Sequence, residues 1–157
     1  MNRTASIELI VAGCAMIAVA GAAESQASFI ADGTTIVSGN GITVRVSRHG
    51  RILTSTHGRE WSEQSVPCRT FLRGIAFGES NFVAVGGSYI DAPGVILTSQ
   101  DGTNWIRRSR NNKTNLYGVA YGSGLFVAVG DAGTILTSHD GRCWKERPSG
   151  TPVALAS

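Results

Sequence analysis

The chain is poor in charge and has no helical periodicity after residue 27. Only 16% of its 157 residues are Asp, Glu, Lys or Arg, and the formal net charge is +3. This mild balance lacks the dense basic stripe that nucleic-acid binding usually needs, so we expect no nucleic-acid partner. Without apolar residues at a spacing of three to four, a helical fold is excluded. The short apolar runs that remain predict an all-β protein.

The chain also lacks the residue sets that common catalytic sites require. The glutamates are scattered over predicted turns and edge strands, so no carboxylate pair at glycosidase separation can be argued. The three histidines, His49, His57 and His139, occupy different places in the sequence repeat, which gives no metal constellation. There is no Ser-His-Asp signature and no phosphate-binding loop. We therefore expect no catalytic residue, no metal and no cofactor.

The first 27 residues predict a secretory signal peptide. A basic start at Arg3 is followed by an apolar run over 9–22 and by small residues that end at Ala27. The run is shorter than the roughly 20 residues of a membrane-spanning helix. We expect a secreted or periplasmic protein. A lipoprotein with Cys14 as the lipid carrier and an uncleaved membrane anchor are the less favoured alternatives.

What the chain does contain is a repeated phrase. Ile-Leu-Thr-Ser occurs at 52–55, 96–99 and 135–138, and each copy leads through a Gly to a Trp. A second phrase, Gly-Val-Ala-Tyr-Gly or a close variant, precedes the second and third copies. Self-similarity at about 40 residues with four short strands in each unit is typical of a propeller blade. The sequence therefore predicts a partial β-propeller of three four-stranded antiparallel blades.

The register divides the chain into five parts. These are a signal peptide at 1–27, a degenerate blade at 31–68, a second blade at 69–112, a third at 113–150 and a tail at 151–157. In the first blade, Arg45 lies within the second strand and the large apolar residues are lost. Cys68 and Cys143 lie two blades apart, beyond disulfide reach, so we expect no disulfide between them.

Each repeated phrase predicts the hairpin between the third and fourth strands of a blade. An Asp at the turn can accept bonds from later backbone N–H groups, and the next Gly tolerates a positive φ. The Trp then returns to the sheet and buries apolar area. At the first copy His57 stands in place of this Asp. The structural residues expected are Ser55, Gly58 and Trp61, then Ser99, Asp101, Gly102 and Trp105, and finally Ser138, Asp140, Gly141 and Trp144.

These phrases resemble the Asp-box (BNR) repeat of sialidase-like propellers and of photosystem II assembly factors of the propeller type. The resemblance covers most of residues 31–150, although the box here is one residue shorter than the usual S-x-D-x-G-x-x-W. In that family the boxes support structure and lie away from the active site. The resemblance implies the fold and says little about the function.

Three blades are too few for a closed ring, which generally has four to eight. An open wedge would expose the flanks of the first and third blades, with apolar surface on both. The chain is then a fragment of a longer product, half of a six-bladed homodimer or a short open stack. The first two readings are favoured equally.

One end of the blades is expected to carry a binding face. Loops on a rigid scaffold commonly hold function, and Arg side chains suit carboxylates and phosphates. The candidate residues are Arg48, Arg69, Arg107, Arg108, Arg110, Lys113, Tyr89 and Asp91. Solvated loop charges are the plainer alternative. We expect a non-catalytic binding or scaffolding module for a protein, an acidic peptide or an acidic glycan. The alternatives are a fragment of a sialidase-like or glycoside hydrolase enzyme, and a propeller similar to photosystem II assembly factors.

Overall fold

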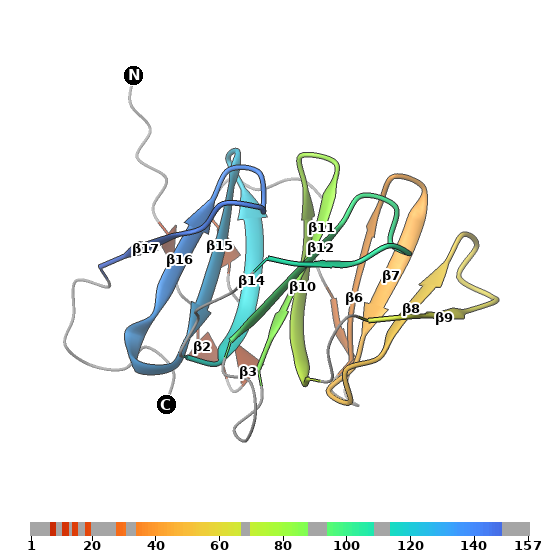
Figure 1. The fold of residues 1–157 in the computed structure, drawn as a ribbon, viewed down its shortest axis with the longest axis horizontal. Helices are drawn as coiled ribbons and strands as arrows, with labels where there is room; N and C mark the ends of the chain where they lie inside the picture. Colours follow the sequence, from red (N-terminus) through yellow and green to blue (C-terminus); the bar gives the residue numbers. More distant parts are fainter. Residues whose placement is uncertain are drawn as a thin grey trace.

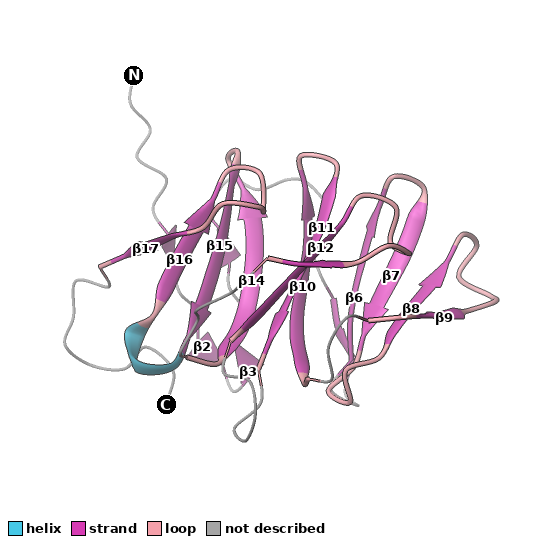
Figure 2. Cartoon of the chain, viewed as in Figure 1, coloured by secondary structure: helices cyan, strands magenta, loops and turns pink. Residues whose placement is uncertain are grey.

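The computed structural model describes residues 34–66, 70–87, 94–108 and 114–148, and short strands between residues 7 and 30. Within this part of the chain the fold is all-β, with one 3₁₀ turn at Asp131–Gly133 and no α-helix (Figure 2). The described residues contain no helix long and apolar enough to cross a membrane. The protein is a partial β-propeller of three antiparallel blades, as the sequence predicts.

Each blade is a meander in which consecutive strands pair. Blade 1 comprises β6 (Thr34–Gly39), β7 (Ile42–Val46), β8 (Ile52–Ser55) and β9 (Ser62–Gln64). Blade 2 comprises β10 (Leu72–Gly78), β11 (Asn81–Gly86), β12 (Val95–Ser99) and β13 (Ile106–Arg107). Blade 3 comprises β14 (Leu116–Gly122), β15 (Leu125–Gly130), β16 (Ile135–Ser138) and β17 (Lys145–Arg147). The three sheets stand side by side like the leaves of a fan (Figure 1).

Blade 1 has a fifth strand that the sequence pattern does not predict. Strand β5 (Ser28–Ile30) pairs antiparallel with β6, so the sheet order is β5-β6-β7-β8-β9. Four two-residue strands precede it: β1 (Ile7–Glu8), β2 (Val11–Ala12), β3 (Cys14–Ala15) and β4 (Ala18–Val19). Strand β1 pairs with β4 and β2 with β3, and β4 contacts β14. The signal peptide at 1–27 stays a prediction.

The core consists of two layers, one between each pair of neighbouring blades. The first layer joins Val44, Val46 and Ile52 of blade 1 to residues of blade 2, among them Phe82 and Leu97. The second joins Val83, Val85 and Ile96 of blade 2 to residues of blade 3. Because successive side chains of a strand point to opposite faces, β11 and β12 supply both layers. Because both faces of these two strands are buried, their sequences are almost continuously apolar.

The two faces of a blade therefore have distinct residues. We call the face of blade 2 toward blade 1 its leading face, formed by Phe77, Phe82, Ala84, Leu97 and Trp105. The opposite face is its trailing face, formed by Ala76, Val83, Val85 and Ile96. The same strand register gives the leading face of blade 3 as Tyr121, Phe126, Ala128, Leu136 and Trp144.

Blade 1 departs from this pattern on its leading face. The register places Ser38 and Thr43 where blade 2 has Phe77 and Phe82, and Arg45 where it has Ala84. Ser38 Oγ and Thr43 Oγ1 are hydrogen-bonded at 2.9 Å, whereas the ring centroids of Phe77 and Phe82 lie 4.7 Å apart. The expectation of an apolar flank on blade 1 is therefore wrong at these positions, because polar side chains replace the aromatic pair.

The far flank of blade 3 is also less exposed than a bare wedge would be. Val127 and Val129 point away from blade 2, yet they are only 1% and 6% exposed. Among the described residues, the large hydrophobic side chains that are exposed are Phe71 and Ile106. At these two positions the side chains predicted to form an apolar flank on blade 3 are buried.

Candidate functional site

The box hairpins of blades 2 and 3 are held by their Asp carboxylates. Asp101 Oδ1 accepts hydrogen bonds from the backbone N–H of Thr103 and of Asn104, both at 2.8 Å. The Asn104 side chain donates to Oδ2 at 2.7 Å, and Ser99 Oγ donates to Oδ1 at 3.0 Å. The bond from the Asn104 backbone is the main cause that holds the pKa of Asp101 far below its ordinary value. All these partners belong to the turn itself.

Asp140 repeats the arrangement in blade 3. Its Oδ1 accepts from the backbone N–H of Arg142 at 2.8 Å and of Cys143 at 3.1 Å. These bonds, that from Arg142 first, lower the pKa of Asp140. Trp144 Nε1 donates to the carbonyl of Gly141 at 2.7 Å, as Trp105 does to Gly102 at 2.8 Å. The Trp is therefore tied to the turn as well as packed against the sheet.

The first box keeps the turn and loses the carboxylate. Ser55 Oγ still accepts from the Gly58 N–H at 2.7 Å, and Gly58 has a φ of +71°. His57 stands in the place of Asp101 and Asp140. Trp61 is half-buried, and the guanidinium of Arg45 lies 5.6 Å from the centroid of its ring. This stacking covers an indole that no blade of the described chain covers.

Arg108, expected on the binding face, has a position that recurs in every blade. Its Nε donates to Thr98 Oγ1 at 2.9 Å. Arg147 donates to Thr137 Oγ1 at 3.0 Å in blade 3, and Gln64 donates to Thr54 Oγ1 at 2.8 Å in blade 1. The fourth strand is thus fastened to the Thr of each Ile-Leu-Thr-Ser phrase. A ligand role for Arg108 stays a prediction beside this structural one.

The other residues of the expected binding face are only partly gathered. Arg48 is exposed in the loop between β7 and β8, and Arg107 is exposed on the edge strand β13, paired with Leu97. Arg107 therefore lies along the side of blade 2 and not in a terminal loop. Five expected residues lie outside the described residues: Arg69, Tyr89, Asp91, Arg110 and Lys113. Cys143 is an exposed free thiol, and Cys68 is outside the described residues.

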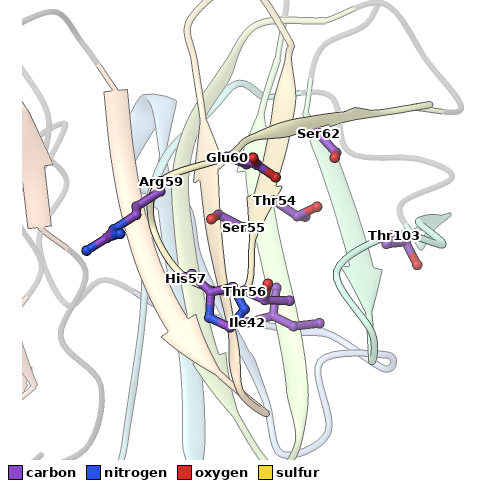
Figure 3. A pocket seen from close by; sticks show the side chains of 9 residues that line it. All are labelled: Ile42, Thr54, Ser55, Thr56, His57, Arg59, Glu60, Ser62 and Thr103. Carbon is purple, nitrogen blue, oxygen red and sulfur yellow. The ribbon is translucent and has the colours of Figure 1, made fainter.

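A depression of about 750 Å³ lies between the first two box hairpins (Figure 3). Five hydroxyl side chains line it, together with one apolar, one imidazole and two charged side chains. They are Thr54, Ser55, Thr56, Ser62 and Thr103, with Ile42, His57, Arg59 and Glu60. Such a surface offers many hydrogen-bonding groups, which suits a peptide chain. The sequence points to this site only through His57, which replaces the box Asp. That Thr103 of blade 2 contributes to the site could not be predicted from the sequence.

A smaller hollow of about 580 Å³ lies at the other end of blade 1, beside His49 and Val66. Its polar wall is an ion pair between Arg51 and Glu63, with 2.6 Å between Nη2 and Oε2. The hydrogen bond from Arg51 lowers the pKa of Glu63, and that pairing raises the pKa of Arg51. Both side chains are half exposed, so the pair contributes little to stability.

A polar cluster joins blades 2 and 3 at the beginning of their first strands. The guanidinium of Arg73 lies 5.1 Å from the centroid of the Tyr117 ring. Tyr117 and Asn115 donate hydrogen bonds to the carboxylate of Asp131. The strand register shifts near the start of β10 and of β14. Arg73 and Tyr117 lie at these shifts and so do not follow the regular alternation of side chains between the two faces of the sheet. Their polar character at one repeat position is readable from the sequence, but the contact between them is not.

The described residues contain no group of three or more His, Cys, Asp and Glu side chains placed to hold a metal. The side chains of the box Asp residues are already occupied by the turns they hold.

Solved structures of YCF48 share this fold. The YCF48 protein bound to a D1 peptide aligns with a TM-score of 0.55 and 16% identity, over 80% of this chain and 44% of that one. YCF48 from Cyanidioschyzon merolae aligns with a TM-score of 0.53 and 21% identity, over 78% and 37%. A GH32 β-fructofuranosidase from Bombyx mori in complex with sucrose reaches only 0.38 with 11% identity, over 73% and 32%.

The chain thus spans less than half the length of the YCF48 structures. No family model and no curated protein matches the sequence. At these identities the likeness concerns the fold. At that level it confirms the resemblance to propellers of the photosystem II assembly-factor type that the repeats predicted.

Proposed function

We propose that this chain is an exported, non-catalytic binding module that takes an acidic peptide segment of a protein partner. The observation that carries the proposal is the open, hydroxyl-lined depression between the first two boxes. It is built on a scaffold in which each box and each fourth strand is fastened by side-chain hydrogen bonds. Rigid elements that hold a polar, open surface favour recognition of an extended chain.

The solved structure of YCF48 with a D1 peptide supports the same class of ligand. That protein shares the fold and not the sequence, so its ligand is a guide to chemistry alone. An acidic segment fits Arg59, whose side chain lines the depression. Arg48 and Arg107 are exposed but lie outside this lining. A glycan has no specific support from these residues.

The proposal does not include a six-bladed ring made of two copies. In such a ring the trailing face of blade 3 would meet the leading face of blade 1. That leading face carries Ser38, Thr43 and Arg45 where blades 2 and 3 have Phe or Tyr, Phe and Ala. These polar side chains, now partly or fully exposed, would lose their contact with water on burial, which costs free energy.

Fluorescence polarisation with labelled decapeptides would test the binding function. We expect capped peptides rich in Asp and Glu to bind, and their Asn and Gln counterparts to bind at least tenfold more weakly. Arg59→Ala removes the guanidinium that lines the depression and should weaken binding several-fold. Arg142→Ala is the matched control, because Arg142 follows the box glycine of blade 3 as Arg59 follows that of blade 1, and it does not line the depression. Equal binding of acidic and amide peptides would refute the proposal.

Export is tested separately. We expect the protein to be recovered outside the cytoplasm with Ser28 as its first residue. N-terminal sequencing of the recovered chain would reveal retention of residues 1–27 and so reject the predicted cleavage.

A further inference from the structure

The first box offers a position for a carboxylate that the chain itself does not supply. In blades 2 and 3 one Asp oxygen lies 2.8–3.1 Å from two consecutive backbone nitrogens, those of Thr103 and Asn104 or of Arg142 and Cys143. The corresponding nitrogens in blade 1 belong to Arg59 and Glu60. His57 holds the Asp position and carries no carboxylate. Two N–H donors are thus presented without their acceptor.

The backbone of the first turn matches that of the other two. Gly58 has a φ of +71°, against +76° for Gly102 and +80° for Gly141. The bond from the Gly N–H to the Ser Oγ is 2.7 Å in the first box and 2.8 Å in each of the others. The first turn therefore matches the other two as far as Gly58, and from this we expect the N–H groups of the next two residues to point toward one position. Within the described residues, no acceptor bonds the N–H of Arg59 or of Glu60, and both residues are exposed.

The same residues line the depression between the boxes, so the position is open to a ligand. Figure 3 labels all of these side chains, and in this view the imidazole of His57 is drawn apart from the side chains of Ser55 and Glu60. Ser55 Oγ is the counterpart of Ser99 Oγ and Ser138 Oγ, which donate to the box carboxylate at 3.0 and 3.1 Å. Glu60 is the one acidic side chain of the lining, and it opposes an anion.

We infer that the first box binds a carboxylate of the ligand, which completes the turn as Asp101 and Asp140 complete theirs. The N–H groups of Arg59 and Glu60 and the hydroxyl of Ser55 donate to it. Charge-assisted bonds of this kind are the stronger class of hydrogen bond. The inference rests on the proposed binding function and names its anchor, an Asp or Glu side chain or a C-terminal carboxylate of the bound peptide.

Amide NMR of the full chain with sodium acetate as the probe tests this directly. At constant ionic strength, held with sodium chloride, we expect the amide signals of Arg59 and Glu60 to shift with a saturable millimolar dependence. His57→Asp supplies an internal carboxylate, so its spectrum should no longer respond to acetate. Absence of saturable shifts in the natural protein would overturn the inference, as would equal shifts in His57→Asp.

Two further variants are expected to gain acetate binding, a result that loss of folding could not produce. Asp101→Ala opens the same position in blade 2, so acetate should now shift the amide signals of Thr103 and Asn104. Glu60→Gln removes the opposing charge, and we expect acetate to bind it several-fold more tightly. A Glu60→Gln protein that binds acetate more weakly would contradict the assigned geometry.

Peptides separate this inference from the binding function. A peptide with an amidated C-terminus and internal Asp, compared with one whose only carboxylate is its C-terminus, distinguishes the two sources. If acidic peptides bind the natural protein and His57→Asp equally, the inference fails while the binding function stands. If acetate binds at Arg59 and Glu60 while no peptide binds, the inference holds and the proposed function fails.

Discussion

Blades 1 and 2 have the same strand register and opposite chemistry on their leading faces. Blade 2 presents the Phe77–Phe82 ring pair, with Phe82 fully buried against blade 1. Blade 1 presents the hydrogen-bonded pair Ser38–Thr43 and an Arg45 stacked on Trp61. A repeat that meets a neighbour is apolar at these positions, and the one that meets none in the described chain is polar. Polar outer faces of this kind cap other stacked repeats.

The largest loss of stability is expected when the aromatic side chain of Phe82 is removed. Phe82→Ala should destabilise the fold by about 3–5 kcal/mol, because a fully buried ring leaves a cavity between blades 1 and 2. Thr43→Ala, at the same position of blade 1, should cost less than about 1 kcal/mol, since only one partly exposed hydrogen bond is lost. Urea denaturation monitored by tryptophan fluorescence measures both. Equal losses would mean that the two leading faces are energetically alike.

The box glycines give the next largest contrast. Gly141→Ala should cost about 2–3 kcal/mol, since a positive φ is strained and the new Cβ would lie 2.8 Å from Val83 Cγ2. At Gly58 a Cβ would meet nothing within 4 Å, so Gly58→Ala should cost only about 1 kcal/mol for the strain. Thermal unfolding of the two variants checks the difference. A larger loss in Gly58→Ala would show that the first box packs against something more.

The box carboxylates give a smaller and pH-dependent effect. Asp101→Ala should cost about 1 kcal/mol at neutral pH, because solvent screens an exposed carboxylate even when several N–H groups bond it. The folded-state pKa of Asp101 lies below its unfolded value, so the carboxylate stabilises the fold above about pH 4. This contribution is lost as the pH falls further. The difference between the urea midpoints of the natural protein and Asp101→Ala should begin to narrow as the pH falls from 7 to 3, and it should vanish only below the folded-state pKa of Asp101.

The smallest effect is expected at the ion pair on blade 1. Glu63→Gln removes the negative charge that pairs with Arg51, yet both side chains are half exposed and salt screens them. The urea midpoint should stay unchanged at physiological salt and fall slightly at low salt. A clear loss at high salt would indicate that the pair supports the hollow beside His49 and not only the surface.

The repeats predicted the blades because their strands, turns and box residues are local features. Asp101, Gly102 and Trp105 interact within a few residues, so their spacing alone identifies the hairpin. Strand β5 was not predicted, because Ser28–Ile30 is too short for a recognisable alternation and outside the repeat. Its pairing with β6 depends on tertiary position.

The site was harder to predict, since it depends on pairs that the repeat brings together across blades. The sequence alone showed that blade 1 has lost its large apolar residues and has Arg45 within its second strand. That Ser38 pairs with Thr43, and that Arg45 covers Trp61, required the register. His57 signalled an altered turn, but Thr103 completes the depression from the next blade. The loop arginines stay a prediction where they lie outside the described residues.

The glycines that end the first strand of each blade determine how that blade joins the next one. A Cβ on Gly39 would strike the ring of Phe77, and one on Gly78 would strike that of Tyr121, at 2.4 and 2.2 Å. Each blade therefore carries a seat for the aromatic ring of its successor, and Gly122 holds the same strand position in blade 3. Blades 2 and 3 are thus joined to the preceding blade by the same kind of contact. A further blade with an aromatic residue at this position would fit against Gly122 in the same way, whereas the Ser38–Thr43 pair of blade 1 offers no ring to such a glycine.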